Sequence, residues 1–97
     1  MFLKVHRSLR DGDVVAVCDC ELLNTTLSNG EIEVHITESF YGNYRASETE
    51  VRDALTRAAN ANLMGERTVA LAIDMGLVTR SGCIMINNVP HALIFRM

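Results

Sequence analysis

The sequence predicts a two-layer α+β domain, in which a mainly antiparallel sheet of about five strands is covered by two consecutive helices. Length is the first observation, because 97 residues and 10.7 kDa suffice for a single domain over residues 1–97. Composition is the second, since 48% apolar and 22% charged residues are globular proportions. The third is the order of patterns: strand-like segments with turn residues, then a stretch of helical periodicity, then two more strand-like segments.

Two strands are expected first. Residues 2–7 contain three apolar side chains, and residues 14–18 form a β-branched run that pairs back on them. Asp11 and Gly12 lie between the two runs and favour a tight hairpin turn, because both residue types tolerate positive φ.

The next segment combines a short helical turn with the clearest strand of the chain. Asp19 is expected to cap a single turn over residues 20–23, with Asn24 as its left-handed C-terminal cap. Residues 29–30, Asn-Gly, then form a turn that opens a strand over residues 31–37. Apolar and polar residues alternate throughout that strand, so one face is expected to be buried and the other solvated.

The first helix begins with a capping box. The Ser47 hydroxyl accepts from the Glu50 amide, and the Glu50 carboxylate reaches back to the cap. Apolar residues then recur at helical spacing over residues 51–63, and Gly65 is expected to end the helix.

A second helix and two strands complete the chain. Residues 68–75 are apolar nearly all round, which indicates a buried helix that Gly76 closes. Strands are expected over residues 83–86 and 92–95, joined by a turn at residues 87–90. Both are apolar at successive positions, which predicts central strands rather than edges.

Charge and segment composition exclude several classes of protein. The net charge of −3 argues against bulk electrostatic attachment to nucleic acid or an anionic membrane. The negative charge is concentrated in residues 31–60, which contain six acidic and three basic residues. Basic residues comprise eight Arg and one Lys, which indicates either recognition of phosphate or carboxylate groups or only codon bias. No signal peptide or membrane span is present and the three cysteines are odd in number, so a cytoplasmic protein without a membrane partner is expected.

The cysteines are the only candidate metal ligands that cluster in the sequence. Cys18 and Cys20 would share a strand face, and with Cys83 and a histidine they could bind zinc. Their spacing departs from the usual C-x₂-C and no second ligand pair follows, so we expect structural thiols and no metal. The scattered glycines form no phosphate loop, so no cofactor is expected.

The junction between the two predicted helices is the first candidate site. Asn60 and Asn62 are poor helix formers at the end of a predicted helix, so they serve either as caps or as contacts to a ligand or partner. Glu66 and Arg67 open the next helix, whose N-terminal N–H groups could hold an anion.

A turn histidine and an aromatic loop are the other candidates. His91 follows Pro90 and either caps the turn or transfers protons. Residues 40–44 form an aromatic loop in which Tyr41 either anchors the core or, with Tyr44, stacks on bases.

Four segments resemble a known family over essentially the whole chain. Residues 40–42 (Phe-Tyr-Gly), 61–67 (Ala-Asn-Leu-Met-Gly-Glu-Arg), 76–78 (Gly-Leu-Val) and 89–92 (Val-Pro-His-Ala) are similar to an archaeal family of short proteins catalogued as domain of unknown function 424. No activity is established for that family. Its genes tend to lie among translation genes, so the resemblance implies a role related to RNA or the ribosome. It marks these positions without assigning them roles: Asn62, Gly65, Glu66, Arg67, Pro90 and His91.

The expected function is that of a small cytoplasmic binding or adaptor protein, with RNA or a translation protein as partner. Arg7, Arg67, Arg96 and the aromatic loop would supply contacts, with Asn62 and His91 as hydrogen-bonding groups. One alternative is a structural or homodimeric subunit with no small ligand. Another is a small enzyme, less expected, in which His91 is the acid/base, Glu66 orients it and Asn62 completes the site.

Overall fold

The computed structural model describes residues 1–10 and 12–96, and it confirms the predicted α+β class. Its main sheet has five strands in the order β1-β2-β5-β7-β6, and every neighbouring pair is antiparallel except β2 and β5. The strands are β1 (Phe2–His6), β2 (Val14–Cys18), β5 (Asn60–Met64), β6 (Ile84–Ile86) and β7 (Val89–Phe95). The sheet therefore places β5, from the middle of the chain, at its centre.

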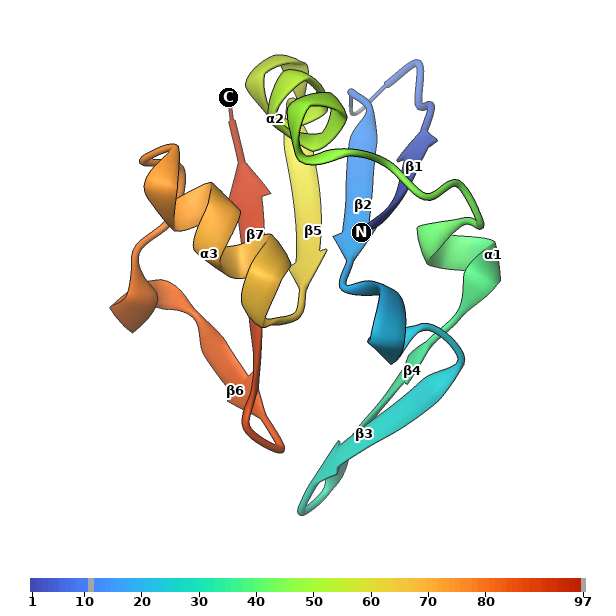
Figure 1. Ribbon diagram of the computed structural model, residues 1–97, viewed down its shortest axis with the longest axis vertical. Coiled ribbons are helices and arrows are strands. Elements are labelled where there is room, and N and C mark those ends of the chain that lie inside the picture. The colour runs from blue at the N-terminus through green and yellow to red at the C-terminus, as the bar shows by residue number, and fades with distance from the viewer. Residues whose placement is uncertain (11, 97) are drawn as a thin grey trace.

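Two helices cover one face of this sheet, as predicted, and we call it the helix face (Figure 1). They are α2 (Glu48–Arg57) and α3 (Glu66–Asp74), and β5 lies between them in the chain. Alternate residues of β2, β5 and β7 face these helices in the larger hydrophobic core, whose fully buried members include Val17, Val51, Leu55, Leu63 and Val69. Burial of such side chains is the main stabilising contribution to the domain.

The opposite face, here called the back face, is covered only in part. A separate hairpin of β3 (Thr25–Asn29) and β4 (Ile32–Ile36), followed by the short helix α1 (Glu38–Tyr41), packs against it. The hairpin projects beyond one end of the main sheet (Figure 1). A second, smaller core forms there, with Ala16, Cys18, Leu27, Ile36, Tyr41, Met64 and Ile86 buried.

The prediction of a helix over residues 51–63 is wrong in its last part. Helix α2 ends at Arg57, and Ala58 already has extended backbone angles (φ −71°, ψ 135°). Residues 60–64 form a strand in which Asn60 and Asn62 alternate with buried Ala61 and Leu63, which is a strand pattern as well as an extension of the helical one. The tertiary fold selects the strand because β5 completes the hydrogen bonds of both β2 and β7.

Three other expectations about strands and turns need correction. The connection between β1 and β2 runs over residues 7–13 and is longer than a tight two-residue turn; Gly12 has positive φ (79°), and Asp11 lies outside the described residues. The strand β3 is missing from the prediction because residues 25–29 are mostly polar, with only Leu27 buried. Strand β6 is at an edge of the sheet, and only β7 is central.

The structure confirms the predictions that depend on short segments, such as helix caps and helix ends. The capping box of Ser47 and Glu50 has both of its hydrogen bonds. Asn24 and Gly76 have the left-handed φ values expected of helix ends, 65° and 76°. A short 3₁₀ helix, η1 (Cys20–Leu22), replaces the predicted turn at residues 20–23, and a second, η2 (Arg80–Gly82), precedes β6. None of the helices in the described chain combines the length and apolar character needed to cross a membrane.

Candidate interaction site

The part of the back face around Asn62 of β5, His91 to Phe95 of β7 and Ile84 of β6 carries exposed apolar side chains, and we call it the open half. Strand register aligns three rows across the sheet: Cys18, Met64, His91 and Ile84; then Ala16, Asn62 and Leu93; then Val14, Asn60 and Phe95. In each row exposure rises away from β2, which α1 covers. The hairpin instead packs against β6, where Ile86 is buried. Ile84 is 56% exposed, Leu93 45% and Phe95 73%, whereas Ala16 and Cys18 are buried.

Tyr41 anchors α1 at the border of the open half. Its side chain is buried, and its hydroxyl donates a 2.7 Å hydrogen bond to Oδ1 of Asn62. Burial, together with the nearby Cys18 thiol, raises the pKa of Tyr41, so the phenol stays protonated and donates. Core anchoring is therefore the role the structure shows for Tyr41, and base stacking on this ring is excluded by its burial.

Asn62 and His91 both lie on the open half. His91 pairs with Met64 across the strands, and Asn62 pairs with Leu93, so the two are diagonal neighbours about 7–8 Å apart. Both are half-buried. Neither the amide nitrogen of Asn62 nor the imidazole makes a hydrogen bond to the described residues, so both have free polar groups at the surface. Burial lowers the pKa of His91, which favours neutral imidazole at neutral pH.

The amino end of α3 is closed by a carboxylate of the chain itself. Asp19 follows β2 and is only 3% exposed. It accepts from the Arg67 amide (3.0 Å), the Thr68 amide (2.9 Å) and the Thr68 hydroxyl (2.8 Å). The expected anion-binding site at this helix end is therefore occupied internally. The predicted capping of η1 by the Asp19 side chain is wrong, because that carboxylate caps α3 instead.

Gly65 is required by the same arrangement. Its φ of 114° is disfavoured for residues with a side chain, and an added Cβ would stand 2.4 Å from Cγ of Asp19. Its amide donates to the Pro90 carbonyl at 2.9 Å, which ties the start of α3 to β7. The glycine of the Gly65-Glu66-Arg67 segment is thus required by the backbone conformation at the start of α3.

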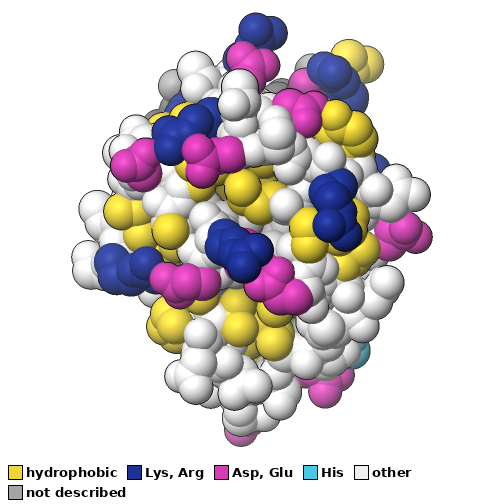
Figure 2. All heavy atoms as spheres, in the orientation of Figure 1, with side chains coloured by type: hydrophobic (Ala, Val, Ile, Leu, Met, Phe, Trp, Pro, Cys, Tyr) yellow, Lys and Arg dark blue, Asp and Glu magenta, His cyan; other side chains and the backbone are white. Residues whose placement is uncertain are grey.

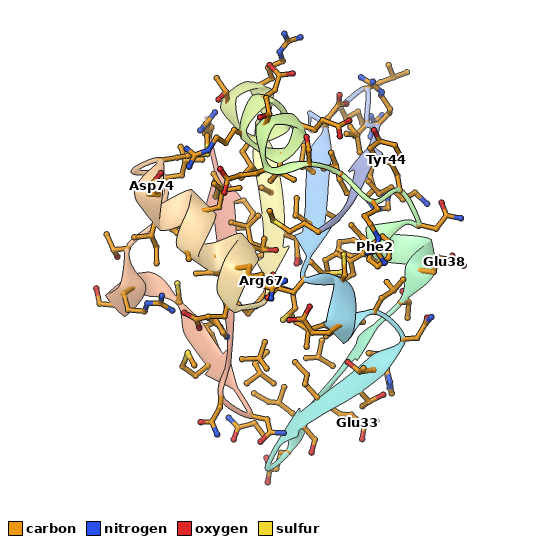
Figure 3. The ribbon with its side chains drawn as sticks, in the orientation of Figure 1. Phe2, Glu33, Glu38, Tyr44, Arg67 and Asp74 are labelled. Atoms are coloured by element: carbon orange, nitrogen blue, oxygen red, sulfur yellow. The ribbon has the colours of Figure 1, made fainter. Side chains whose placement is uncertain are left out.

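The side chains of Glu66 and Arg67 lie on the helix face. Glu66 forms an ion pair with Arg80 (2.9 Å). Arg67 is exposed at the start of α3, beside the turn that follows β2 (Figure 3), and its guanidinium has no partner within the described part of the chain. Figure 2 shows basic and acidic side chains next to one another over α2 and α3; the ion pairs of Arg52 with Glu48 and Asp74 belong to this surface.

Of the three residues in the hypothetical enzyme site, His91, Glu66 and Asn62, the structure brings only two together. The structure brings His91 and Asn62 together on the back face. Burial is the cause that lowers the pKa of His91, with no contribution from a carboxylate, and Glu66 is engaged by Arg80.

The three cysteines are free thiols, and the two tyrosines of the aromatic loop differ in exposure. Cys18 is buried and Cys20 and Cys83 are half-buried, all as free thiols, and residues 1–10 and 12–96 contain no group of three or more potential metal ligands. Burial and nearby acidic groups raise the pKa of Cys18 to about 12, so its thiol is protonated. Tyr44 is exposed and donates a hydrogen bond to Glu50, whereas Tyr41 is buried (Figure 3 shows Tyr44).

Sequence reasoning missed four residues that the structure makes prominent: Asp19 as the cap of α3, and Ile84, Leu93 and Phe95 on the open half. Alternation in residues 89–95 was the available signal for the last two. It places Leu93 and Phe95 on the face opposite to Ala92 and Ile94. Asp19 gave no local signal, because its partners lie 48 and 49 residues further along the chain.

The fold and site define a small α+β domain with one sheet face half covered. The chain belongs to the family described as a protein of unknown function (DUF424), whose model matches residues 6–97. It is also similar to a solved structure, the crystal structure of an uncharacterized conserved protein from Methanopyrus kandleri. That likeness has 25% sequence identity and a TM-score of 0.78, and covers 99% of this chain and 92% of the other. A search of curated proteins finds no match.

Proposed function

We propose that this protein is a small cytoplasmic binding or adaptor protein that presents the open half of its sheet to a partner in translation or RNA metabolism. The observation that carries the proposal is the exposure of Ile84, Leu93 and Phe95 on adjacent strands of one face. Apolar side chains that are contiguous and exposed mark interaction surfaces more often than singly scattered ones do.

The polar groups beside these side chains support a binding role. Asn62 and His91 have free hydrogen-bonding atoms within a largely apolar surface, which is the composition of a specific interface. Asn62 is held by Tyr41, so its amide is oriented before a partner arrives. Such preorganisation lowers the entropy cost of binding.

Affinity purification of the tagged protein from native cells, with and without RNase, tests this function. The variant L93S/F95S changes the open half, whereas I32S removes an exposed apolar residue at the tip of the β3–β4 hairpin and is the matched control. We expect wild type and I32S to recover RNA or translation proteins and L93S/F95S to lose them. Equal recovery by all three proteins, or recovery of no such component, would refute the proposal.

A further inference from the structure

We propose that a hollow between α2 and α3 binds a small zwitterionic molecule, with a carboxylate at Arg67 and an ammonium group at the opposite end beside Asp74. This inference goes beyond the proposed function, because the hollow lies on the helix side of the domain and the open half lies on the back face. It gives the domain a second binding site and states the class of ligand that the site takes.

The hollow has a volume of about 380 Å³ and is open to solvent. Both helices line it, through Glu48 and Arg52 of α2 and through Arg67, Leu71 and Asp74 of α3. Its volume is within the range of about 300–1,000 Å³ that is usual for small-molecule sites. The hollow therefore has room for a ligand of a few carbon atoms with polar groups at both ends.

Arg67 forms the positive end of the hollow. It is the only arginine of α2 and α3 whose guanidinium has no partner among the described residues, since the other two form ion pairs. Its neighbour Glu66 is engaged by Arg80 and does not line the hollow. Asp19 already occupies the amides at the start of α3, so an anion here is bound by the side chain of Arg67. The planar guanidinium offers parallel donors that match a carboxylate.

The other end of the hollow is negative. Arg52 donates to Asp74 (2.7 Å) and to Glu48 (3.5 Å), so two carboxylates share one positive charge and a net charge of −1 remains. The side chains of Asp74 and Glu48 are 67% and 66% exposed. Oδ1 of Asp74 and Oε1 of Glu48 accept no hydrogen bond from the described residues. Both oxygens can therefore accept from an ammonium group.

An apolar surface separates the two charged ends. Arg67 and Asp74 lie at opposite ends of α3 (Figure 3), and the seven residue steps between them correspond to about 10 Å along the helix axis. Between them the hollow is lined by Leu71, one turn after Arg67, and by Ala70 and Met1. Figure 2 shows apolar side chains between the charged ones over these helices. An aliphatic chain between the two charged groups of a ligand matches this surface.

The arrangement of charge favours a ligand with both signs over a ligand with one. A simple anion at Arg67 is repelled by the carboxylates of Glu48 and Asp74, and a simple cation beside Asp74 is repelled by Arg67. A zwitterion with an aliphatic chain is attracted at both ends. A free ω-amino acid and the C-terminal lysine of a peptide share this chemistry, so both are represented among the probes below.

NMR titration of the isotope-labelled full chain with 6-aminohexanoate and with Nα-acetyl-lysine tests the inference, and the probe that binds more tightly identifies the source. We expect saturable shifts of the amides of residues 48–52 and 67–74, with Kd in the millimolar range because the ion pairs are exposed. Hexanoate and pentylamine, which each have one charged group, should bind at least about threefold more weakly. R67Q should weaken zwitterion binding about threefold to fivefold. D74N should weaken the binding of 6-aminohexanoate and not that of hexanoate.

Two matched variants serve as controls. R10Q removes an exposed arginine without a partner among the described residues, and D53N removes a carboxylate of α2 that lies outside the hollow. Both should bind as wild type does. No saturable shift, wild-type affinity in R67Q, equal affinity for hexanoate and 6-aminohexanoate, or shifts confined to the open half would each overturn the inference. L93S/F95S should bind the zwitterion normally, so failure of the proposed function and failure of this inference are seen in different variants.

Discussion

Removing the Asp19 carboxylate should destabilise the domain by an amount that its contacts define. D19A leaves two amides and one hydroxyl without their acceptor, at a site that is 3% exposed. A buried donor without a partner costs about 1–3 kcal/mol, and loss of an N-cap about 0.5–2 kcal/mol. Because the Arg67 amide is only part-buried and the two costs overlap, we expect a loss of about 3–4 kcal/mol. A domain typically has about 5–15 kcal/mol of stability, so the variant should still fold.

Urea denaturation followed by far-UV circular dichroism measures this loss as a shift in midpoint at unchanged slope. N-terminal capping of α2 provides the comparison, because S47A removes an exposed cap and should cost only about 1 kcal/mol. If D19A costs no more than S47A, the buried contacts of Asp19 do not hold α3 as described.

Gly65 gives an independent test of the same contact. G65A forces a Cβ to within 2.4 Å of Cγ of Asp19, so it should displace the capping carboxylate. It should also cost about 1–3 kcal/mol of backbone strain, because φ 114° with ψ 157° is a conformation that essentially only glycine adopts. In the background of D19G, which removes the clashing atoms, G65A should cost the strain alone. The two substitutions should therefore be coupled by about 3 kcal/mol, and strictly additive effects would refute the reasoning.

The remaining predictions concern three groups of the back face. Burial lowers the pKa of His91 below its usual 6.5, so the unfolded chain binds the proton more readily and stability falls as pH drops through that value. H91N should lose less stability than wild type between about pH 7.5 and 5, and equal losses in urea titrations would contradict this. Y41F should cost about 1 kcal/mol in wild type and much less in the N62A background; additive losses would show that their hydrogen bond contributes nothing. Of the three thiols, Cys18 should react with a thiol reagent only on unfolding, because it is buried and its pKa is raised to about 12. Rapid reaction of all three thiols in the native protein would contradict this prediction.

The sequence by itself determined the features that depend on neighbouring residues. The box of Ser47 and Glu50 fixes the start of α2, because both of its hydrogen bonds form within one helical turn. Asn87 and Asn88 have positive φ (49° and 65°) in the turn between β6 and β7, as their residue type favours. The α+β class followed from such local signals taken together.

Only the tertiary structure decided what residues 60–64 become. Their alternation fits a strand and their spacing from Leu55 fits a helix, so local pattern leaves both available. Pairing with β2 on one side and β7 on the other provides hydrogen bonds and burial that a longer α2 would lack. The result is that Asn60 and Asn62, which the sequence analysis placed at the end of a helix either as caps or as contacts to a ligand or partner, lie on a sheet face.

The candidate site depends on the tertiary structure in the same way. Asp19 meets α3 across 48 residues, so no local pattern distinguishes its carboxylate from a free helix end that binds an anion. The open half exists because α1 packs over β1 and β2 and the β3–β4 hairpin packs against β6 near Ile86, which leaves Leu93 and Phe95 of β7 exposed. Which half of a sheet is covered depends on long-range packing of apolar surface, and that free energy is set by the assembled fold rather than by neighbouring residues.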